Sequence, residues 1–421
     1  MNAPKERAGL ARIFLSVGPA LITASVVLGP GSILSASKVG YQQGYSMTWV
    51  LLLAVLLMIG LTALSSRLGV VLKSTLCEEL AVRAGRPWAA ITGVSLFLIA
   101  ACFQFGNNLG VLAAVEPFLP VEQAKFWKVA IIVVINAVVL IALFGFRHLY
   151  KPVETMMKIM VGLMVLGFAV NLAFAGPDLL KALNGLIPRN VEFTRDSLLP
   201  VIGLFATTFS IGGAFYQAYL VRQKGWTLKD ARQGIVDSAL GIGVLGLLTM
   251  MIMLTAAAVL HGQKDIALNS ATDVARQLEP LFGVMARNLF CMGIFAGAFS
   301  SFLVNAMIGG TVLSDGLGGG GNMDDRWPKI CTSLALAMGM IVALGMQFTD
   351  LKPVNLIIFA QAVTTLGLPA LAVALLYLAT RPDLTGERAI PAWMKAVAVA
   401  ALLAALVLAG NLLIKVIGAL S

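Results

Sequence analysis

The stretch SVVLGPGSILSASKVG, Ser25–Gly40, lies inside the first long apolar run of the chain and places Gly29, Pro30 and Gly31 in succession. Proline removes a backbone donor and clashes with the preceding helical turn, and glycine is a weak helix former. In lipid, unpaired backbone groups are costly and are tolerated only inside protein or beside a water-filled cavity. The stretch therefore predicts a membrane span that is interrupted where it lines a site.

The rest of the chain has the composition of a polytopic α-helical membrane protein. Of its 421 residues, 59% are apolar and 12% are charged, whereas soluble domains are nearer half apolar and a quarter charged. Continuous apolar runs near 20 residues recur, each long enough to cross the bilayer, and they do not alternate as barrel strands do. We expect an all-α fold with eleven spans, at about 14–37, 46–71, 90–115, 127–146, 153–175, 198–221, 237–261, 286–312, 330–348, 354–379 and 393–418.

Charge predicts the orientation in the membrane. The net charge of +10 is better explained by basic cytoplasmic loops than by nucleic-acid binding, and the basic bias is strongest over 222–232. We expect a retained first helix, a cytoplasmic N-terminus and an external C-terminus. A monomer in a bacterial inner membrane, with lipids and a small-molecule or ion substrate as its partners, fits this organisation.

A second interruption occurs in the sixth span. The run FATTFSIGGAFYQAYLVRQKG, 205–225, carries Gly212-Gly213 close to Thr207, Thr208 and Ser210. Two broken spans that lie five apart indicate an inverted repeat of five plus five spans. We expect one transporter domain over 1–421, with repeats at about 14–175 and 198–379 and an extra span at 393–418. The alternative is that these glycines only let helices pack closely.

Paired breaks predict a substrate site. The half-helix ends carry partial charges, and their freed backbone groups serve as ligands in transporters. We therefore expect Gly29–Ser32 and Ser210–Gly213 to meet around the substrate.

Four segments resemble one known family. They are GPGSILSASKVGYQQGY (Gly29–Tyr45), the second span with its SxRLG element (Ser65–Gly69), the pair Asp237-Ser238, and AQAVTTLGLPAL (Ala360–Leu371). Together these are similar to the natural resistance-associated macrophage protein (Nramp) family of divalent-metal transporters, and the resemblance covers about residues 15–380. It implies a LeuT-type fold with discontinuous first and sixth spans.

The family's metal-binding residues do not appear at the matching positions. By this resemblance, the Asp and Asn of the first break fall on Gly29 and Ser32, and a Met-Pro-His element falls on Ser210-Ile211-Gly212. Acidic third-span residues that the family links to proton movement fall on the neutral Gln104 and Asn107. The sequence thus predicts a divergent member without the metal site or the proton route.

The missing ligands shift the expected substrate. A bare divalent ion is costly to bury without carboxylates, whereas backbone N–H groups at half-helix N-termini suit a small anion. We expect a small anion such as bicarbonate; the alternatives are hydrated Mg²⁺ or Mn²⁺, or a small neutral or zwitterionic solute. The expected substrate-binding residues are Gly29, Pro30, Gly31, Ser32, Gln104, Asn107, Thr207, Thr208, Ser210, Gly212, Gly213 and Gln361.

The remaining motifs bear on the ion that could drive transport and on the function classes other than a transporter. Ser300, Ser301 and Asn305 form a possible Na⁺ site, with helix packing as the alternative role of the serine pair; symport, uniport and exchange stay open. We expect no enzyme activity, because HExxH, GxSxG and paired intramembrane carboxylates are absent from the sequence, and no cofactor beyond a possible Na⁺. A channel or a membrane-bound regulator is the alternative to a transporter.

Overall fold

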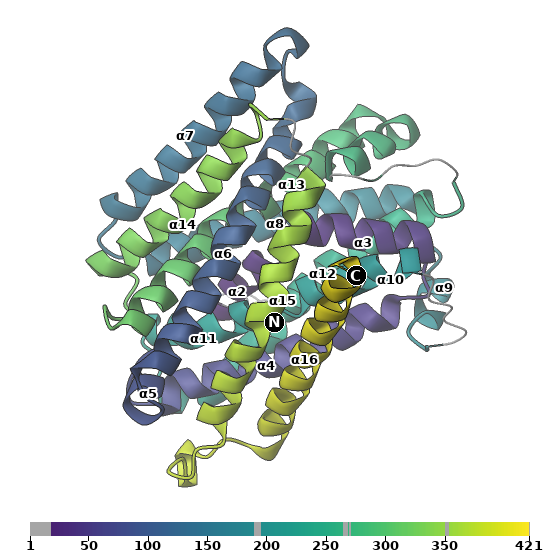
Figure 1. Cartoon of the computed structure of the whole chain (residues 1–421). Coiled ribbons are helices and arrows are strands. Elements are labelled where there is room, and N and C mark those ends of the chain that lie inside the picture. The colour runs from purple at the N-terminus through teal and green to yellow at the C-terminus, as the bar shows by residue number, and fades with distance from the viewer. Residues whose placement is uncertain (1–17, 189–194, 264–267, 269–270, 350–352, 421) are drawn as a thin grey trace, which may run out of the picture.

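The computed structural model describes residues 18–188, 195–263, 268, 271–349 and 353–420, and within these ranges the regular elements are all helical (Figure 1). The α-helices are α2 (Pro19–Val27), α3 (Pro30–Gln43), α4 (Thr48–Val71), α5 (Leu76–Arg83), α6 (Arg86–Val115), α7 (Ala124–Gly145), α8 (Tyr150–Ala175), α9 (Leu179–Asn184), α10 (Arg195–Thr208), α11 (Ile211–Gln223), α12 (Ala231–Val259), α13 (Ala271–Leu317, kinked at Gly283), α14 (Arg326–Gly345), α15 (Pro353–Ala379) and α16 (Ala392–Leu420).

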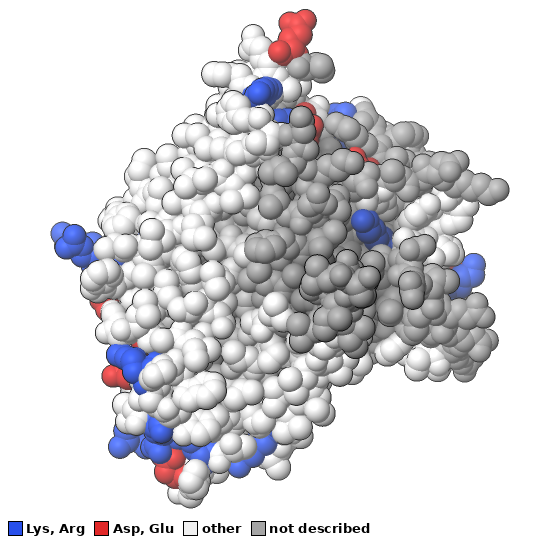
Figure 2. All heavy atoms as spheres, in the orientation of Figure 1, with Lys and Arg blue, Asp and Glu red and all other residues white. Residues whose placement is uncertain are grey.

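The described helices match a multispan membrane protein. Among the described residues, nine segments are long and apolar enough to cross a bilayer, one of them formed by α10 and α11 together, and α2 with α3 adds a tenth, bent span. The expected span at about 354–379 falls on α15, where Leu366–Ala379 is a shorter apolar helix within the described part of the chain. Only 22% of the apolar window of α7 is buried, so its side chains face outward as lipid contact requires. Broad uncharged areas also cover the face drawn in Figure 2, and its charged atoms gather most densely toward the lower end.

The first span is broken, as the opening stretch predicts. Helices α2 and α3 meet at 62°, with Leu28 and Gly29 outside both helices. Pro30 is the first residue of α3, where its missing N–H costs no hydrogen bond. The expected end of this span near residue 37 was wrong, because α3 runs on to Gln43.

The second break lies slightly before the glycine pair. The non-helical residues are Phe209 and Ser210, whereas Gly212 and Gly213 belong to the first turn of α11. The Ser210 side chain accepts a hydrogen bond from the backbone N of Gly213 at 3.2 Å, and this N-cap starts the helix ahead of the glycines. The expectation that Gly212-Gly213 forms the break is corrected accordingly.

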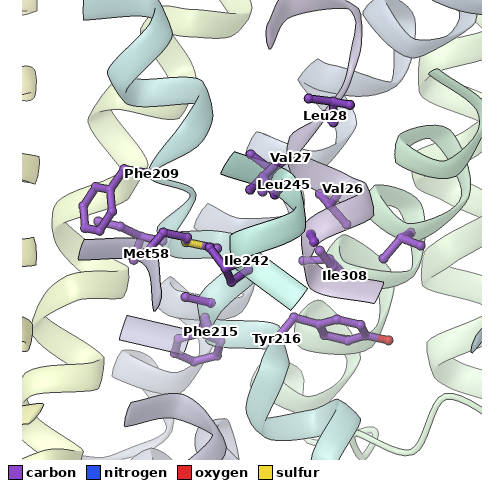
Figure 3. Packing of buried hydrophobic residues seen from close by; sticks show 14 of the residues in the cluster. Val26, Val27, Leu28, Met58, Phe209, Phe215, Tyr216, Ile242, Leu245 and Ile308 are labelled. Carbon is purple, nitrogen blue, oxygen red and sulfur yellow. The ribbon is translucent and has the colours of Figure 1, made fainter. Parts of the chain in front are cut away.

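The two broken spans pack side by side. The Thr23 hydroxyl of α2 donates to the side-chain oxygen of Gln217 in α11 at 2.7 Å. A Cβ on Gly203 of α10 would lie 3.1 Å from the Ser35 hydroxyl of α3. Each half of one span therefore lies against a half of the other. Figure 3 shows apolar residues from both breaks within one buried cluster, namely Val26, Val27, Leu28, Phe209, Phe215 and Tyr216.

Glycine sets the distance between α3 and α12. A Cβ on Gly40 would lie 2.9 Å from the backbone N of Ala257 and closer still to the carbonyl of Met253. Backbone atoms cannot rotate away, so the two helices would have to separate. We expect Gly40→Ala to lower the unfolding free energy by about 1–3 kcal/mol, measured by thermal denaturation of the purified protein. Gly243→Ala on α12 is the matched control: no heavy atom lies within 4 Å of its added Cβ, and a stability loss there of equal size would contradict this explanation.

An ion cluster ties α5 to the segment between α15 and α16. Arg381 contacts Glu79 at 2.5 Å and Asp383 at 2.7 Å, and Arg83 contacts Asp383 at 2.9 Å. Hydrogen bonding from Arg381, aided by its charge, lowers the pKa of Asp383 to about 2. Because this folded-state pKa lies below the unfolded value near 3.9, the stabilisation is present above pH 4 and is lost as the pH falls toward 2.

This sign gives a pH prediction for Asp383. We expect the melting-temperature difference between the unchanged protein and Asp383→Asn to be constant from pH 7 to pH 5 and to shrink below pH 4. Paired thermal scans across this range measure it. A difference that grows on acidification would contradict the assigned direction.

Candidate functional site

Hydroxyl groups surround the end of α2 at the first break. Ser32 donates to the carbonyl of Val27 at 2.5 Å, and Ser301 of α13 donates to the carbonyl of Val26 at 2.6 Å. A hydroxyl has one hydrogen and two lone pairs. Both hydrogens are therefore used on α2, and only lone pairs of these two oxygens remain for a further partner.

A chain of buried amides on α6 reaches the same place. The Gln104 side-chain nitrogen donates to the carbonyl of Phe302 at 2.9 Å, and the Asn107 side-chain nitrogen donates to the Gln104 side-chain oxygen at 3.0 Å. Because a carbonyl can only accept, Phe302 fixes which end of Gln104 is the nitrogen, and Gln104 in turn fixes Asn107. The side-chain nitrogen of Asn107 is therefore used in this series of hydrogen bonds, and its side-chain oxygen is not.

The oxygen of Asn107 points at the break. A Cβ built on Gly29 would lie 3.4 Å from Asn107 Oδ1 and 3.0 Å from Ser301 Oγ. Gly29 has no side chain to fill this space, so two neutral oxygen acceptors approach its backbone. Beyond it, Gly31 is exposed, and a Cβ there would meet no heavy atom within 4 Å. The first break is therefore open at Gly31 and lined by hydrogen-bond acceptors at Gly29.

The amide chain extends farther than the sequence indicated. Asn108 donates to the carbonyl of Gln104, and Asn136 of α7 donates to the side-chain oxygen of Asn108, both at 2.8 Å. Sequence reasoning missed Asn136, although an amide in the middle of an apolar span is a signal that it needs a partner. Polar contacts therefore join α7 to the break through α6.

The residues expected to bind Na⁺ do come together with α2. Ser300 donates to the carbonyls of Ser25 and Gly297, at 3.2 and 3.1 Å, and Asn305 donates to the Ser301 hydroxyl at 3.3 Å. In this arrangement the hydroxyls bond directly to the carbonyls of α2. A Na⁺ ion between them would have to replace these hydrogen bonds, and the sodium site stays a prediction.

The expected residues of the second break are less clearly placed at the site. Thr207 donates to the carbonyl of Gly203 on its own helix at 2.8 Å, while the buried Thr208 hydroxyl has no hydrogen-bond partner. A Cβ on Gly212 would meet Leu96 of α6, so this glycine faces apolar packing. The side chain of Gln361 lies outside the described residues.

The charged ligands of a metal centre are not gathered at the break. Among the described residues, no group of three or more His, Cys, Asp or Glu side chains could hold a metal ion. The nearest polar groups of the described part are amides, hydroxyls and carbonyls. This donor set can orient a ligand by hydrogen bonds, but it offers no full negative charge.

Comparison with known proteins assigns the chain to a family. The profile described as "Natural resistance-associated macrophage protein-like" matches residues 20–415. The chain is 26% identical to the divalent metal cation transporter MntH of Deinococcus radiodurans over 388 residues, which is 90% of this chain and 84% of that protein. It is 25% identical to MntH of Pectobacterium carotovorum, over 90% of this chain and 89% of that one.

Solved structures show the same fold. A mutant of the Eremococcus coleocola manganese transporter superposes with a TM-score of 0.80 at 15% identity, covering 97% of this chain and 88% of that one. MhsT in complex with L-phenylalanine superposes with a TM-score of 0.55 at 16% identity, covering 93% and 97%. The fold is LeuT-like, as the sequence predicts, and the chain is a membrane transporter that belongs to the natural resistance-associated macrophage protein family.

Proposed function

We propose that this protein transports a divalent cation, Mg²⁺ or Mn²⁺, which keeps most of its water shell at the first break. Two observations support the proposal. The relatives that match most of the chain are named divalent metal cation transporters, and the described polar groups around Gly29 are oriented with their oxygens toward the break. The sequence analysis favoured a small anion as the substrate, and that substrate is less well supported than a divalent cation.

The orientation of Asn107 carries the argument. A hydrated cation presents water hydrogens outward, so its shell needs hydrogen-bond acceptors. Asn107 Oδ1, the lone pairs of Ser32 and the one lone pair of Ser301 that Asn305 leaves free supply acceptors. The N–H and O–H groups of these three side chains donate within the protein. With no carboxylate in this set, stripping the ion of its water would be very costly. Mg²⁺ releases water reluctantly, which matches a site of neutral oxygens.

A small anion such as bicarbonate is the second candidate, and one observation favours it. Gly31 lies in the first turn of α3, where helix N–H groups have no partner within the helix, and it is exposed. The partial positive charge of a helix N-terminus attracts anions. The hydroxyls of Ser32 and Ser301 at the first break already donate to α2 and have no hydrogen left for an anion, so we place this candidate second.

The remaining expectations extend the same proposal. They are alternating access between the two predicted repeats, coupling to Na⁺ through Ser300, Ser301 and Asn305, and a monomer in a bacterial inner membrane. The distribution of Lys and Arg supports a cytoplasmic N-terminus.

Flux measurements on one preparation separate the two cargoes. Proteoliposomes that contain the full chain are loaded with a divalent-cation indicator in one set and tested with radiolabelled bicarbonate in another, with and without a Na⁺ gradient. We expect saturable Mg²⁺ or Mn²⁺ uptake and bicarbonate entry no faster than in protein-free liposomes. Bicarbonate accumulation without divalent-cation uptake would overturn the proposed cargo.

A further inference from the structure

A carboxylate from a neighbouring helix caps the start of α2. The backbone N–H groups of Gly18 and Ala20 donate to the two oxygens of Asp237 at 2.8 and 2.9 Å. Gly18 has no side chain to cap the helix, and Pro19 has no N–H to donate. Asp237 lies in α12 and is 2% exposed, so this distant residue performs the capping that α2 lacks locally.

The cap belongs to a larger set of contacts that joins three helices. Gln217 of α11 donates to Asp237 at 3.2 Å and accepts from the Thr23 hydroxyl of α2 at 2.7 Å. Close packing accompanies these bonds, because a Cβ on Gly241 of α12 would lie 2.6 Å from the backbone of Ala20. Helix α2 is therefore held at its first turn and at its middle.

The position of α2 decides access to the break from one side. All nine residues of α2 are buried, whereas Gly31 at the start of α3 is exposed. The break is therefore closed on the side of α2, and a route to it there requires α2 to move away from α11 and α12. The non-helical residues Leu28 and Gly29 join α2 to α3, so the helix is already interrupted at the point about which such a movement would turn.

We propose that Asp237 is a latch on α2, whose two hydrogen bonds to Gly18 and Ala20 hold the α2 side of the site closed and break when that side opens. Asp237 is a positioning residue in this account and does not touch the cargo. The inference goes beyond the proposed function, since it applies to any substrate of this site.

A labelling experiment without any cargo tests the latch. Val26 is 7% exposed at the end of α2, so the rate at which a membrane-impermeant maleimide modifies Val26→Cys reports opening when the reagent is added from the face where α2 begins. Asp237→Asn keeps the shape but loses one of two acceptors and the charge. We expect it to raise the labelling rate roughly tenfold, measured against the same chain without the introduced cysteine.

Two controls distinguish a latch from general loosening. Ser238→Ala removes a buried hydroxyl that bonds only within α12, to the carbonyl of Gly234, and should leave the rate unchanged. The native Cys291 is buried in α13 and should stay unlabelled in every variant. An unchanged rate in Asp237→Asn, or a parallel rise at Cys291, would overturn the proposal.

A second variant covers the case in which Asp237→Asn does not reach the membrane. Gln217→Leu removes the donor that orients the Asp237 carboxylate and the bridge from Asp237 to Thr23. This weakens the latch without deleting its two acceptors, so we expect a smaller rise of about threefold. No rise in this variant would equally contradict the latch.

Discussion

Replacing Asn107 with leucine should reduce the apparent affinity for the transported divalent cation by roughly a hundredfold. The substitution removes the oxygen that faces Gly29 and leaves the buried side-chain oxygen of Gln104 without the donor it has now. The lost acceptor is worth about 1–3 kcal/mol of binding free energy, and the upper end of this range corresponds to about two orders of magnitude in affinity. The unpaired Gln104 oxygen lowers the folding stability instead. Initial uptake rates in proteoliposomes over a range of cation concentrations measure the change.

Asn171→Leu is the matched control for this prediction. Asn171 is also a buried amide, but its nitrogen donates to the carbonyl of Gly167 on its own helix, α8. Its side-chain oxygen has no hydrogen-bond partner, so an apolar replacement of similar shape should leave uptake unchanged. Equal losses in both variants would show that any buried amide matters, and the assigned role of Asn107 would then be wrong.

Introducing the family's carboxylate at the first break should impair the protein rather than restore a metal site. In Gly29→Asp the new Cβ lies 3.0 Å from the Ser301 hydroxyl and 3.4 Å from the Asn107 side-chain oxygen, so the carboxylate is introduced next to two acceptors. We expect a stability loss of about 1–3 kcal/mol from overpacking and at least a tenfold fall in cation uptake. Thermal denaturation and flux assays on the same preparation measure both.

Two further variants identify the cause. Ser301→Ala in the Gly29→Asp background removes the crowded oxygen and should recover most of the stability. Gly31→Asp places the same charge two residues along, where a Cβ meets no heavy atom within 4 Å and a helix N-terminus favours acidic residues. This variant should remain as stable as the unchanged chain. Stable, active Gly29→Asp protein would contradict the crowding that the geometry shows.

The overall architecture was predictable from the sequence because it rests on strong and local signals. Long apolar runs predict the spans. Pro30 between two glycines predicts the first break to within a few residues, since the break was expected at Gly29–Ser32 and the non-helical residues are Leu28 and Gly29. The second break was placed a few residues late, because Gly212 and Gly213 draw attention although Ser210 caps the helix before them. Glycine content alone cannot show which residue begins a helix, since that depends on which side chain satisfies the first N–H groups.

The chemistry of the site was less predictable. The sequence indicated neutral residues at Gly29, Ser32 and Asn107, from which an anion seemed the better substrate. It could not show that the hydroxyls donate to α2, or that Phe302 fixes the direction of the amide chain. Hydrogen-bond polarity depends on contacts between α2, α6 and α13, which are far apart in the chain. The cap from Asp237 to α2 was hidden for the same reason.

The most direct measurement of the central claim is competition by hexaamminecobalt(III), an exchange-inert complex that presents N–H donors much as a hydrated Mg²⁺ ion presents water hydrogens. Acceptors at Asn107, Ser32 and Ser301 should bind this complex without removing its ligands. We predict that it inhibits Mg²⁺ or Mn²⁺ uptake into proteoliposomes competitively, and that Asn107→Leu weakens the inhibition as much as it weakens cation uptake. Divalent-cation uptake that is insensitive to the complex would contradict recognition of a hydrated ion.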